Sequence, residues 1–127
     1  MSLTVLIVDD SKLARMSVIK ALRSLFPNWS HLEASNADEA LTQMREHKVD
    51  LALLDFNMPG RDGLALAAEL KAMDAKLPLA VVSANHQEEI VRRATDIGAV
   101  FLAKPLTEKL LAGFLSQVVE TSKPAAG

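Results

Sequence analysis

The sequence predicts an α/β fold with a doubly wound, five-stranded parallel sheet. Short β-branched and apolar runs alternate five times with longer segments of helical periodicity, which is typical of repeated strand–helix units. Four of the five short runs are almost entirely apolar, as expected for strands that are buried on both faces. A chain of 127 residues without a shift in composition corresponds to one domain with a core of its own.

Five short runs are predicted to be strands. They are Thr4–Val8, His31–Ala34, Val49–Leu54, Pro78–Val82 and Val100–Ala103. His31–Ala34 is the most polar of the five, and a strand at the edge of a sheet is less buried than a central one. We therefore predict that His31–Ala34 forms an edge strand.

Hydrophobic spacing and capping residues predict five helices, one after each strand. Asn36 and Thr107 are good N-cap residues for the second and fifth helices, and Gly98 is placed to end the fourth. The helical segments are Ser11–Phe26, the segment that starts after Asn36, Leu64–Met73, Gln87–Ile97, and the segment from Thr107 to about Glu120.

Composition excludes several classes of function. The formal net charge is −2, so neither nucleic acid nor a membrane is an expected partner. There is no cysteine, which excludes disulfides, thiolate metal sites and cysteine nucleophiles. The chain has no apolar run of roughly 18 residues and no signal-peptide pattern at its start, so we expect a cytoplasmic protein. The expected domain covers residues 1–120, and residues 121–127 are expected to be a flexible tail or the start of a linker.

Polar residues follow the predicted strands at the points where those strands end. Asp9 and Asp10 follow the first strand, Asp55 the third, Ser83 the fourth and Lys104 the fifth. Because ligands of open α/β sheets bind outside the carboxyl ends of the strands, we expect these side chains to converge. Three carboxylates that share a site repel one another and favour a hard cation, and oxygen-only ligands indicate Mg²⁺.

The same residues predict a site that accepts a phosphoryl group. A carboxylate can act as the nucleophile and form an acyl phosphate, with a cation and a hydroxyl donor to hold the transferring oxygens. Taken singly, each residue also has a purely structural interpretation. Asp10 is a candidate N-cap, Asp55 a candidate turn residue, Lys104 a candidate solvated strand end and Ser83 a candidate cap of the fourth helix.

The ordered set of motifs resembles the receiver domain of two-component response regulators. The resemblance covers about residues 3 to 120 and implies a flavodoxin-like (βα)₅ fold with strand order 2-1-3-4-5. The matching segments are Val5-Leu6-Ile7-Val8-Asp9-Asp10, Leu53-Leu54-Asp55-Phe56-Asn57-Met58-Pro59-Gly60-Arg61-Asp62-Gly63, Val81-Val82-Ser83-Ala84 and Phe101-Leu102-Ala103-Lys104-Pro105.

The resemblance implies a role for each matching position. Asp55 is the implied phosphoacceptor, and Mg²⁺ (or Mn²⁺) would be bound by Asp9, Asp10, Asp55 and the backbone carbonyl of Asn57. Ser83 matches the switch hydroxyl, and Lys104 matches the lysine that pairs with the phosphoryl group, with a cis bond to Pro105 that is typical of the family. Phe101 takes the place of the aromatic switch, which is more often Tyr, and Asn85 lies at a position that tunes dephosphorylation.

The implied function is a signalling switch, not a conventional enzyme, although the domain would promote its own phosphorylation and dephosphorylation. A histidine kinase or a histidine phosphotransfer protein would donate the phosphoryl group to Asp55. The surface of the fourth helix, fifth strand and fifth helix would then change for a downstream effector protein or an output domain. Dimerisation on phosphorylation is a further expectation.

Three other functions are weighed against this interpretation. A dehalogenase-type phosphatase would need a second Asp two residues after the nucleophile, where this chain has Asn57. A flavin carrier would need a phosphate-binding loop after the first strand, where Asp9 and Asp10 would repel phosphate. A phosphorylation-independent interaction module of the same fold is the remaining alternative.

Three further features have both a structural and a functional interpretation. The basic residues of the first helix are expected to form a solvated face, with docking of the phosphodonor as the alternative. The fifth helix is more broadly apolar than one buried stripe requires, which indicates either deep packing or a partner surface. Trp29 is expected to be a packing residue. The basic residues of the first helix are Lys12, Arg15, Lys20 and Arg23. The apolar residues of the fifth helix are Leu110, Leu111, Phe114, Leu115, Val118 and Val119.

Overall fold

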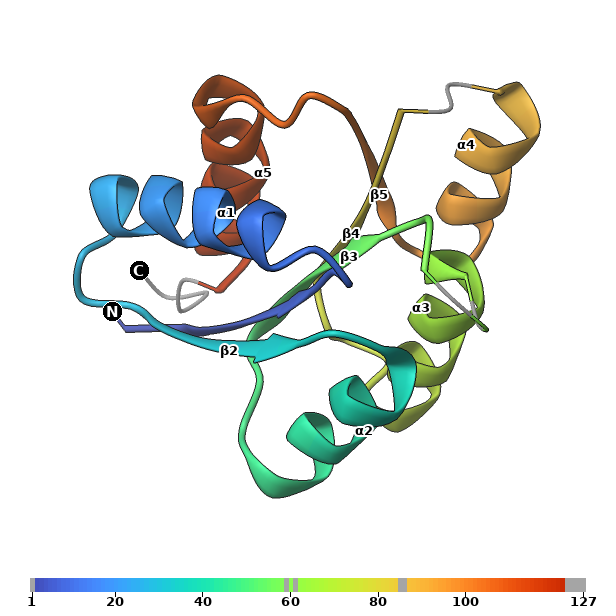
Figure 1. Ribbon diagram of the computed structural model, residues 1–127, viewed down its shortest axis with the longest axis horizontal. Helices are drawn as coiled ribbons and strands as arrows, with labels where there is room; N and C mark the ends of the chain where they lie inside the picture. Colours follow the sequence, from blue (N-terminus) through green and yellow to red (C-terminus); the bar gives the residue numbers. More distant parts are fainter. Residues whose placement is uncertain (1, 59, 61, 85–86, 123–127) are drawn as a thin grey trace.

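Five parallel strands form the centre of the molecule, and helices cover both faces of the sheet (Figure 1). The computed structural model describes residues 2–58, 60, 62–84 and 87–122. The strand order is β2-β1-β3-β4-β5, which confirms the doubly wound topology expected from the sequence. The elements in chain order are β1 (Thr4–Val8), α1 (Lys12–Leu25), β2 (Ser30–Ala34), α2 (Ala37–Glu46), β3 (Leu51–Asp55), α3 (Gly63–Met73), β4 (Leu79–Ser83), α4 (Glu88–Asp96), β5 (Val100–Ala103) and α5 (Glu108–Ser122).

The two faces of the sheet carry separate hydrophobic cores. Helices α1 and α5 lie together on one face, and α2, α3 and α4 lie on the other (Figure 1). Alternate residues of one strand therefore enter different cores: Val5 and Ile7 pack towards α1 and α5, whereas Leu6 and Val8 pack towards the other three helices. Burial on both faces explains why the central strands have almost no polar residues before their carboxyl ends.

Strand β2 lies at an edge of the sheet, as its polar sequence predicts. Its burial pattern is mixed, and only Ala34 at its end is fully buried. The strand pairs with β1 alone among the described strands, with Val8 opposite Ala34. This last pair brings the end of β2 next to the acidic residues that follow β1.

Strands β3 and β4 each extend one residue further than the hydrophobic pattern predicts. Asp55 and Ser83 are the final residues of these strands, because their backbones still pair with Val82 and Ala103 on the neighbouring strands. The ladder continues with a bond from the Lys104 amide to the Ser83 carbonyl, 3.0 Å long. Backbone pairing thus holds both polar side chains in fixed positions at the sheet edge.

The capping residues predicted from the sequence are confirmed. The Asn36 side chain accepts a hydrogen bond from the Glu39 amide at 2.8 Å, and the Thr107 hydroxyl accepts one from the Leu110 amide at 3.1 Å. Gly98 follows α4 with a φ of 79°, a left-handed conformation that favours glycine. Helix α5 continues to Ser122, two residues beyond its predicted end, and residues 123–127 of the expected tail lie outside the described residues.

Helix α5 and Trp29 show how the apolar residues outside the sheet are used. Leu111, Phe114, Leu115 and Val118 are buried against the sheet, which confirms deep packing for most of the helix, and Leu110 is exposed. Trp29 is 7% exposed and stacks on Phe26 with ring centroids 4.0 Å apart, so it is a packing residue as expected.

No helix among the described residues has both the length and the apolar character needed to cross a membrane.

Gly63 permits the close approach of α3 to the end of β3. A Cβ atom at this position would lie 2.5 Å from the Asp55 carbonyl oxygen and 2.8 Å from the Phe56 Cα atom. The Gly63 amide also donates a 2.9 Å hydrogen bond to the Phe56 carbonyl. The start of α3 can therefore lie against the backbone of Asp55 and Phe56 because position 63 has no side chain.

We expect Gly63→Ala to lower the free energy of unfolding by about 2–3 kcal/mol, since the atoms in the way are backbone atoms that cannot rotate aside. Urea denaturation measures the change. Gly113→Ala is the matched control, because a Cβ at this helical position meets nothing within 4 Å. That control should be more stable by about 0.5–1 kcal/mol. Equal stability of the two variants would contradict the close packing at Gly63.

Candidate functional site

The candidate site lies at the carboxyl edge of the sheet, where four neighbouring strands end. Asp9 and Asp10 leave β1, Asp55 ends β3, Ser83 ends β4 and Lys104 follows β5. The strand order places β3 between β1 and β4, so Asp55 has the other polar residues on both sides. These polar residues therefore converge at the edge where open α/β sheets are expected to bind their ligands.

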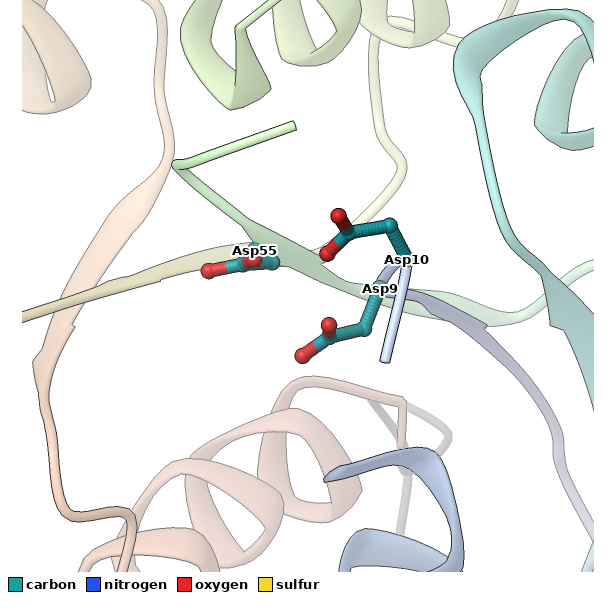
Figure 2. Close-up of side chains that lie close together, drawn as sticks. All are labelled: Asp9, Asp10 and Asp55. Carbon is teal, nitrogen blue, oxygen red and sulfur yellow. The ribbon is translucent and has the colours of Figure 1, made fainter. Parts of the chain in front are cut away.

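Three carboxylates meet at this edge. One oxygen atom from each of Asp9, Asp10 and Asp55 lies within 4.8 Å of the others (Figure 2). Asp55 is 5% exposed, Asp9 is half-buried and Asp10 is exposed. The convergence predicted from the strand ends is therefore present, and the cluster opens towards solvent on the side of Asp10.

Asp9 is held by its own backbone and by the start of α1. Its amide donates to the Ala34 carbonyl at 3.0 Å, and its Oδ1 atom accepts a 2.9 Å bond from the Ser11 amide. Burial raises the pKa of Asp9 above its ordinary value of 3.8, and the negative charges of Asp55 and Asp10 raise it further. The Ser11 hydrogen bond and the charge of Lys104 lower this pKa but do not cancel the effect of burial.

Lys104 forms an ion pair with Asp55. The Lys104 Nζ atom lies 2.7 Å from the Asp55 Oδ1 atom, with the lysine side chain 36% exposed and the carboxylate 5% exposed. The peptide bond from Lys104 to Pro105 is cis, in agreement with the expected feature. Three aspartates and one lysine give the cluster a formal charge of −2, which one divalent cation would balance.

The remaining predicted residues lie on the same edge or beside it. Ser83 is fully buried at the end of β4, and Phe101 on β5 is opposite Val81 and packs against the core on the side of α2, α3 and α4. Asn57 is exposed, two residues beyond Asp55. These positions do not by themselves test the roles that the resemblance implies for Ser83, Phe101 and Asn57. Asn85, and Pro59 and Arg61 of the motif, lie outside the described residues.

The structure contradicts the helix-capping roles considered for Asp10 and Ser83. Helix α1 is capped by Ser11, whose hydroxyl accepts from the Ala14 amide at 3.2 Å, and not by Asp10. The cap position of α4 is Gln87, and not Ser83. Asp55 lies within a strand, and Lys104 pairs with a buried carboxylate. The capping roles are therefore excluded for Asp10 and Ser83, whereas Lys104 does follow a strand end and has a carboxylate partner there.

Arg15 is the residue at this edge that its sequence pattern did not reveal. The expectation of a solvated face is wrong for this residue, because its side chain is only 14% exposed. Its Nη1 atom donates to the Asp9 carbonyl at 2.6 Å, and its Nε atom donates to the Glu33 carboxylate at 2.9 Å. Helical side chains point back towards the N-terminus, so an arginine one turn into α1 reaches the end of β1. This general direction of helical side chains is the feature of the sequence that could have placed Arg15 near Asp9.

A recess of about 630 Å³ opens beside the acidic cluster. It is lined by small residues of α1, by apolar residues after β5, and by three members of the site, Asp9 among them. Its walls include Ala14, Ser17, Ala21, Leu106, Asp55 and Lys104. The recess gives the nearly buried Asp55 carboxylate a way to the surface between α1 and the connection from β5 to α5.

The family model for the response regulator receiver domain matches residues 5–115. This chain belongs to the response regulator receiver domain family. Receiver domains are signalling domains of two-component systems, phosphorylated on aspartate and able to bind Mg²⁺ at an acidic pocket. The matched segment includes every residue predicted for the site and all five strands except Thr4, the first residue of β1.

Individual relatives agree with this assignment. The chain is 40% identical over 118 residues to the positive alginate biosynthesis regulatory protein of Pseudomonas aeruginosa, covering 91% of this chain and 46% of that protein. It is 32% identical over 120 residues to the chemotaxis protein CheY of Halobacterium salinarum, covering 94% and 98% of the two chains. A solved CheX–CheY–BeF₃–Mg²⁺ complex from Borrelia burgdorferi matches with a TM-score of 0.84 and 26% identity, covering 92% of this chain and 89% of that one.

We expect the raised pKa of Asp9 to make Asp9→Asn more stable than the wild type at pH 7 in the absence of divalent cations. The folded receiver domain holds the Asp9 proton more tightly than the unfolded chain does, so ionisation of Asp9 costs stability as the pH rises above 3.8. Asparagine removes that cost and keeps an acceptor for the Ser11 amide.

Urea denaturation at a series of pH values, with a chelator present, checks this expectation. The advantage of Asp9→Asn should shrink as the pH is lowered towards 3.8, because the wild-type carboxyl group becomes neutral as well. A variant that is less stable than the wild type at pH 7 would show that burial does not dominate at Asp9.

Proposed function

We propose that this receiver domain accepts a phosphoryl group from a phosphohistidine onto Asp55. The observation that supports the proposal is the environment of the Asp55 carboxylate. This carboxylate is nearly buried, pairs with Lys104 at 2.7 Å, and lies within 4.8 Å of carboxylate oxygens from Asp9 and Asp10. The donor would be a histidine kinase or a histidine phosphotransfer protein.

The donor set fits Mg²⁺, or Mn²⁺ in its place. All the candidate ligands are oxygen atoms, and hard cations of this kind are held by one or two carboxylates together with water and phosphate oxygens. Asp9, Asp10, Asp55 and the backbone carbonyl of Asn57 would hold the ion. When bound, the ion supplies charge neutralisation on the transferring phosphoryl oxygens.

The residues of the site can carry out the transfer. An oxygen of the Asp55 carboxylate attacks the phosphorus atom, and an O–P bond forms as the P–N bond to the donor histidine breaks. The electron pair of the broken bond returns to the imidazole nitrogen. Lys104 offers its ammonium group to the phosphoryl oxygens, and the recess beside α1 admits the donor side chain to the nearly buried Asp55.

Phosphorylation would act on the rest of the domain through Ser83 and Phe101. The acyl phosphate adds oxygens beside the end of β4, where the Ser83 hydroxyl can donate to them. Movement of this residue would open space for Phe101, which is partly buried on the adjacent strand β5. Because α4 packs against β5, the surface of α4, β5 and α5 would carry the change to a partner.

The partner on the output side would be a downstream effector protein or an output domain in a cytoplasmic signalling pathway. This chain spans about half the length of several curated relatives that it matches, including the alginate regulator. Those relatives therefore have further sequence outside the receiver domain. The CheY of Halobacterium salinarum, in contrast, is matched over 98% of its length, so both an output domain and a separate effector protein have a counterpart among the relatives.

We expect Asp55→Asn to abolish phosphorylation, because an amide cannot form the acyl phosphate. Incubation with a small-molecule phosphodonor such as acetyl phosphate, followed by intact-mass measurement, should show an added phosphoryl group in the wild type and none in the variant. Asp62→Asn is the matched control: Asp62 caps α3 seven residues later, and asparagine is an equally good cap.

Undiminished labelling of Asp55→Asn would refute the phosphoacceptor assignment. Absence of labelling in the wild type, with either acetyl phosphate or a phosphorylated histidine donor, would favour the phosphorylation-independent interaction module. Labelling that is lost in Asp62→Asn as well would show that the substitutions act through the fold.

We also expect Mg²⁺ to stabilise the wild type against unfolding. A cation at 100 times its dissociation constant adds about 2.7 kcal/mol to the free energy of unfolding if it binds only the folded state. Asp10→Asn removes one ligand and should reduce this gain, whereas Asp96→Asn, at the exposed end of α4, should keep it. Thermal denaturation with and without MgCl₂ measures the difference, and equal gains in the two variants would contradict the proposed ligands.

A further inference from the structure

Arg15 connects the acidic cluster to the edge strand β2. Its side chain extends from the first turn of α1 and makes two directed hydrogen bonds, one to the Asp9 carbonyl at 2.6 Å and one to the Glu33 carboxylate at 2.9 Å. Its backbone amide also donates to the Ser11 carbonyl at 3.1 Å. A single residue therefore links α1, β2 and the connection between β1 and α1.

We infer that Arg15 is a positioning residue for the proposed Mg²⁺ site, and that it acts by fixing the peptide group between Asp9 and Asp10. This inference rests on the proposed function. Arg15 is not a candidate ligand, because a guanidinium group is always charged and has no acceptor atom. Its effect on the cation would pass entirely through the two aspartates.

The peptide bond explains how one hydrogen bond can orient two side chains. The Asp9 carbonyl and the Asp10 amide belong to the same planar group, so the direction of the carbonyl sets the direction in which Asp10 leaves the strand. The Arg15 Nη1 atom holds that carbonyl on the side facing α1. Figure 2 shows the Asp9 and Asp10 side chains on different sides of the chain, both directed towards Asp55.

Asp9 is then held at three points. Its amide bonds to Ala34 on β2, its carbonyl bonds to Arg15, and its Oδ1 atom bonds to the Ser11 amide. These described bonds leave the Oδ2 atom for a cation. Ligand groups that are fixed in this way by outer partners bind metals more tightly, and loss of such a partner lowers metal affinity by about 10–100-fold.

Glu33 keeps the arginine in place. Its carboxylate accepts from Nε, and its backbone carbonyl accepts a 3.1 Å bond from the Gln43 side chain on α2. The planar guanidinium fork can serve the Asp9 carbonyl and the Glu33 carboxylate at once, whereas a lysine ammonium is a point charge on a flexible stem. Geometry at this position therefore requires arginine.

If Arg15 is a positioning residue, its removal changes Mg²⁺ affinity in the direction opposite to that expected from its charge alone. Arg15 is a cation near a cluster that would bind a second cation, so removal of its charge should tighten Mg²⁺ binding if only electrostatics mattered. If Arg15 positions Asp9 and Asp10, its removal should weaken Mg²⁺ binding instead. The two explanations are thus distinguished by the direction of the effect.

The test is isothermal titration of MgCl₂ into the full chain, comparing the wild type with Arg15→Met, Arg15→Lys and Arg23→Met. We expect Arg15→Met to weaken Mg²⁺ binding about tenfold or more. Arg15→Lys should also bind more weakly than the wild type, although it keeps the charge. Arg23→Met is the matched control, since Arg23 is an exposed arginine in the last turn of the same helix.

A second measurement separates positioning from loss of stability. In the metal-free protein, the amide proton of Ser11 reports its bond to Asp9 Oδ1, and its NMR chemical shift should change in Arg15→Met but not in Arg23→Met. If Arg15→Met does not fold, as judged by circular dichroism, Arg15→Lys decides the outcome by the same titration.

Mg²⁺ affinity that is unchanged or tighter in folded Arg15→Met, or unchanged in Arg15→Lys where only that variant folds, would overturn the positioning role and leave the proposed function intact. A wild type that binds no Mg²⁺ would overturn the proposed metal site, and the positioning role with it. The two failures are therefore distinguishable in one experiment.

Discussion

The mutual repulsion of three carboxylates at one sheet edge is the constraint on which this structure depends. Two unit charges about 5 Å apart repel by about 3 kcal/mol at an effective dielectric constant near 20, and here three such oxygens lie within 4.8 Å of one another. Lys104 offsets part of this cost through its ion pair with Asp55. The rest of the repulsion must be offset by the packing of the strands that carry the aspartates.

The supports lie in the backbone and in the two cores. Strand β3 is buried along its whole length between cores on opposite faces, which leaves Asp55 little freedom to move away from its neighbours. Gly63 lets α3 close tightly beneath it, and Arg15 ties the Asp9 carbonyl to the edge strand. The site is thus held together by hydrophobic burial and backbone bonds against its own electrostatic repulsion.

Most of this arrangement can be predicted from the sequence because it follows from periodicity. Apolar runs identify strands buried on both faces, and parallel strands bring Asp9, Asp55 and Lys104 to a common edge. The apolar pattern does not locate the strand ends, because the backbones of Asp55 and Ser83 still pair with the neighbouring strands after the pattern stops. The bonds of Arg15 to Asp9 and Glu33 depend on how α1 lies over β2, and tertiary placement of this kind leaves no periodic trace.

Under the proposed function, the burial of Asp55 would let a small chemical change there act on the rest of the domain. The carboxylate is 5% exposed, so solvent and salt screen its charge poorly, and an acyl phosphate dianion there would act strongly on neighbouring dipoles. Next to it lie Ser83, which is fully buried at the end of β4, and Lys104, which follows β5 and is 36% exposed. On the other side, β1 is clamped by Ala34, Ser11 and Arg15. Under the proposed function, the response would therefore travel through Lys104, which pairs with Asp55, bonds to the Ser83 carbonyl and follows β5, the strand that α4 packs against.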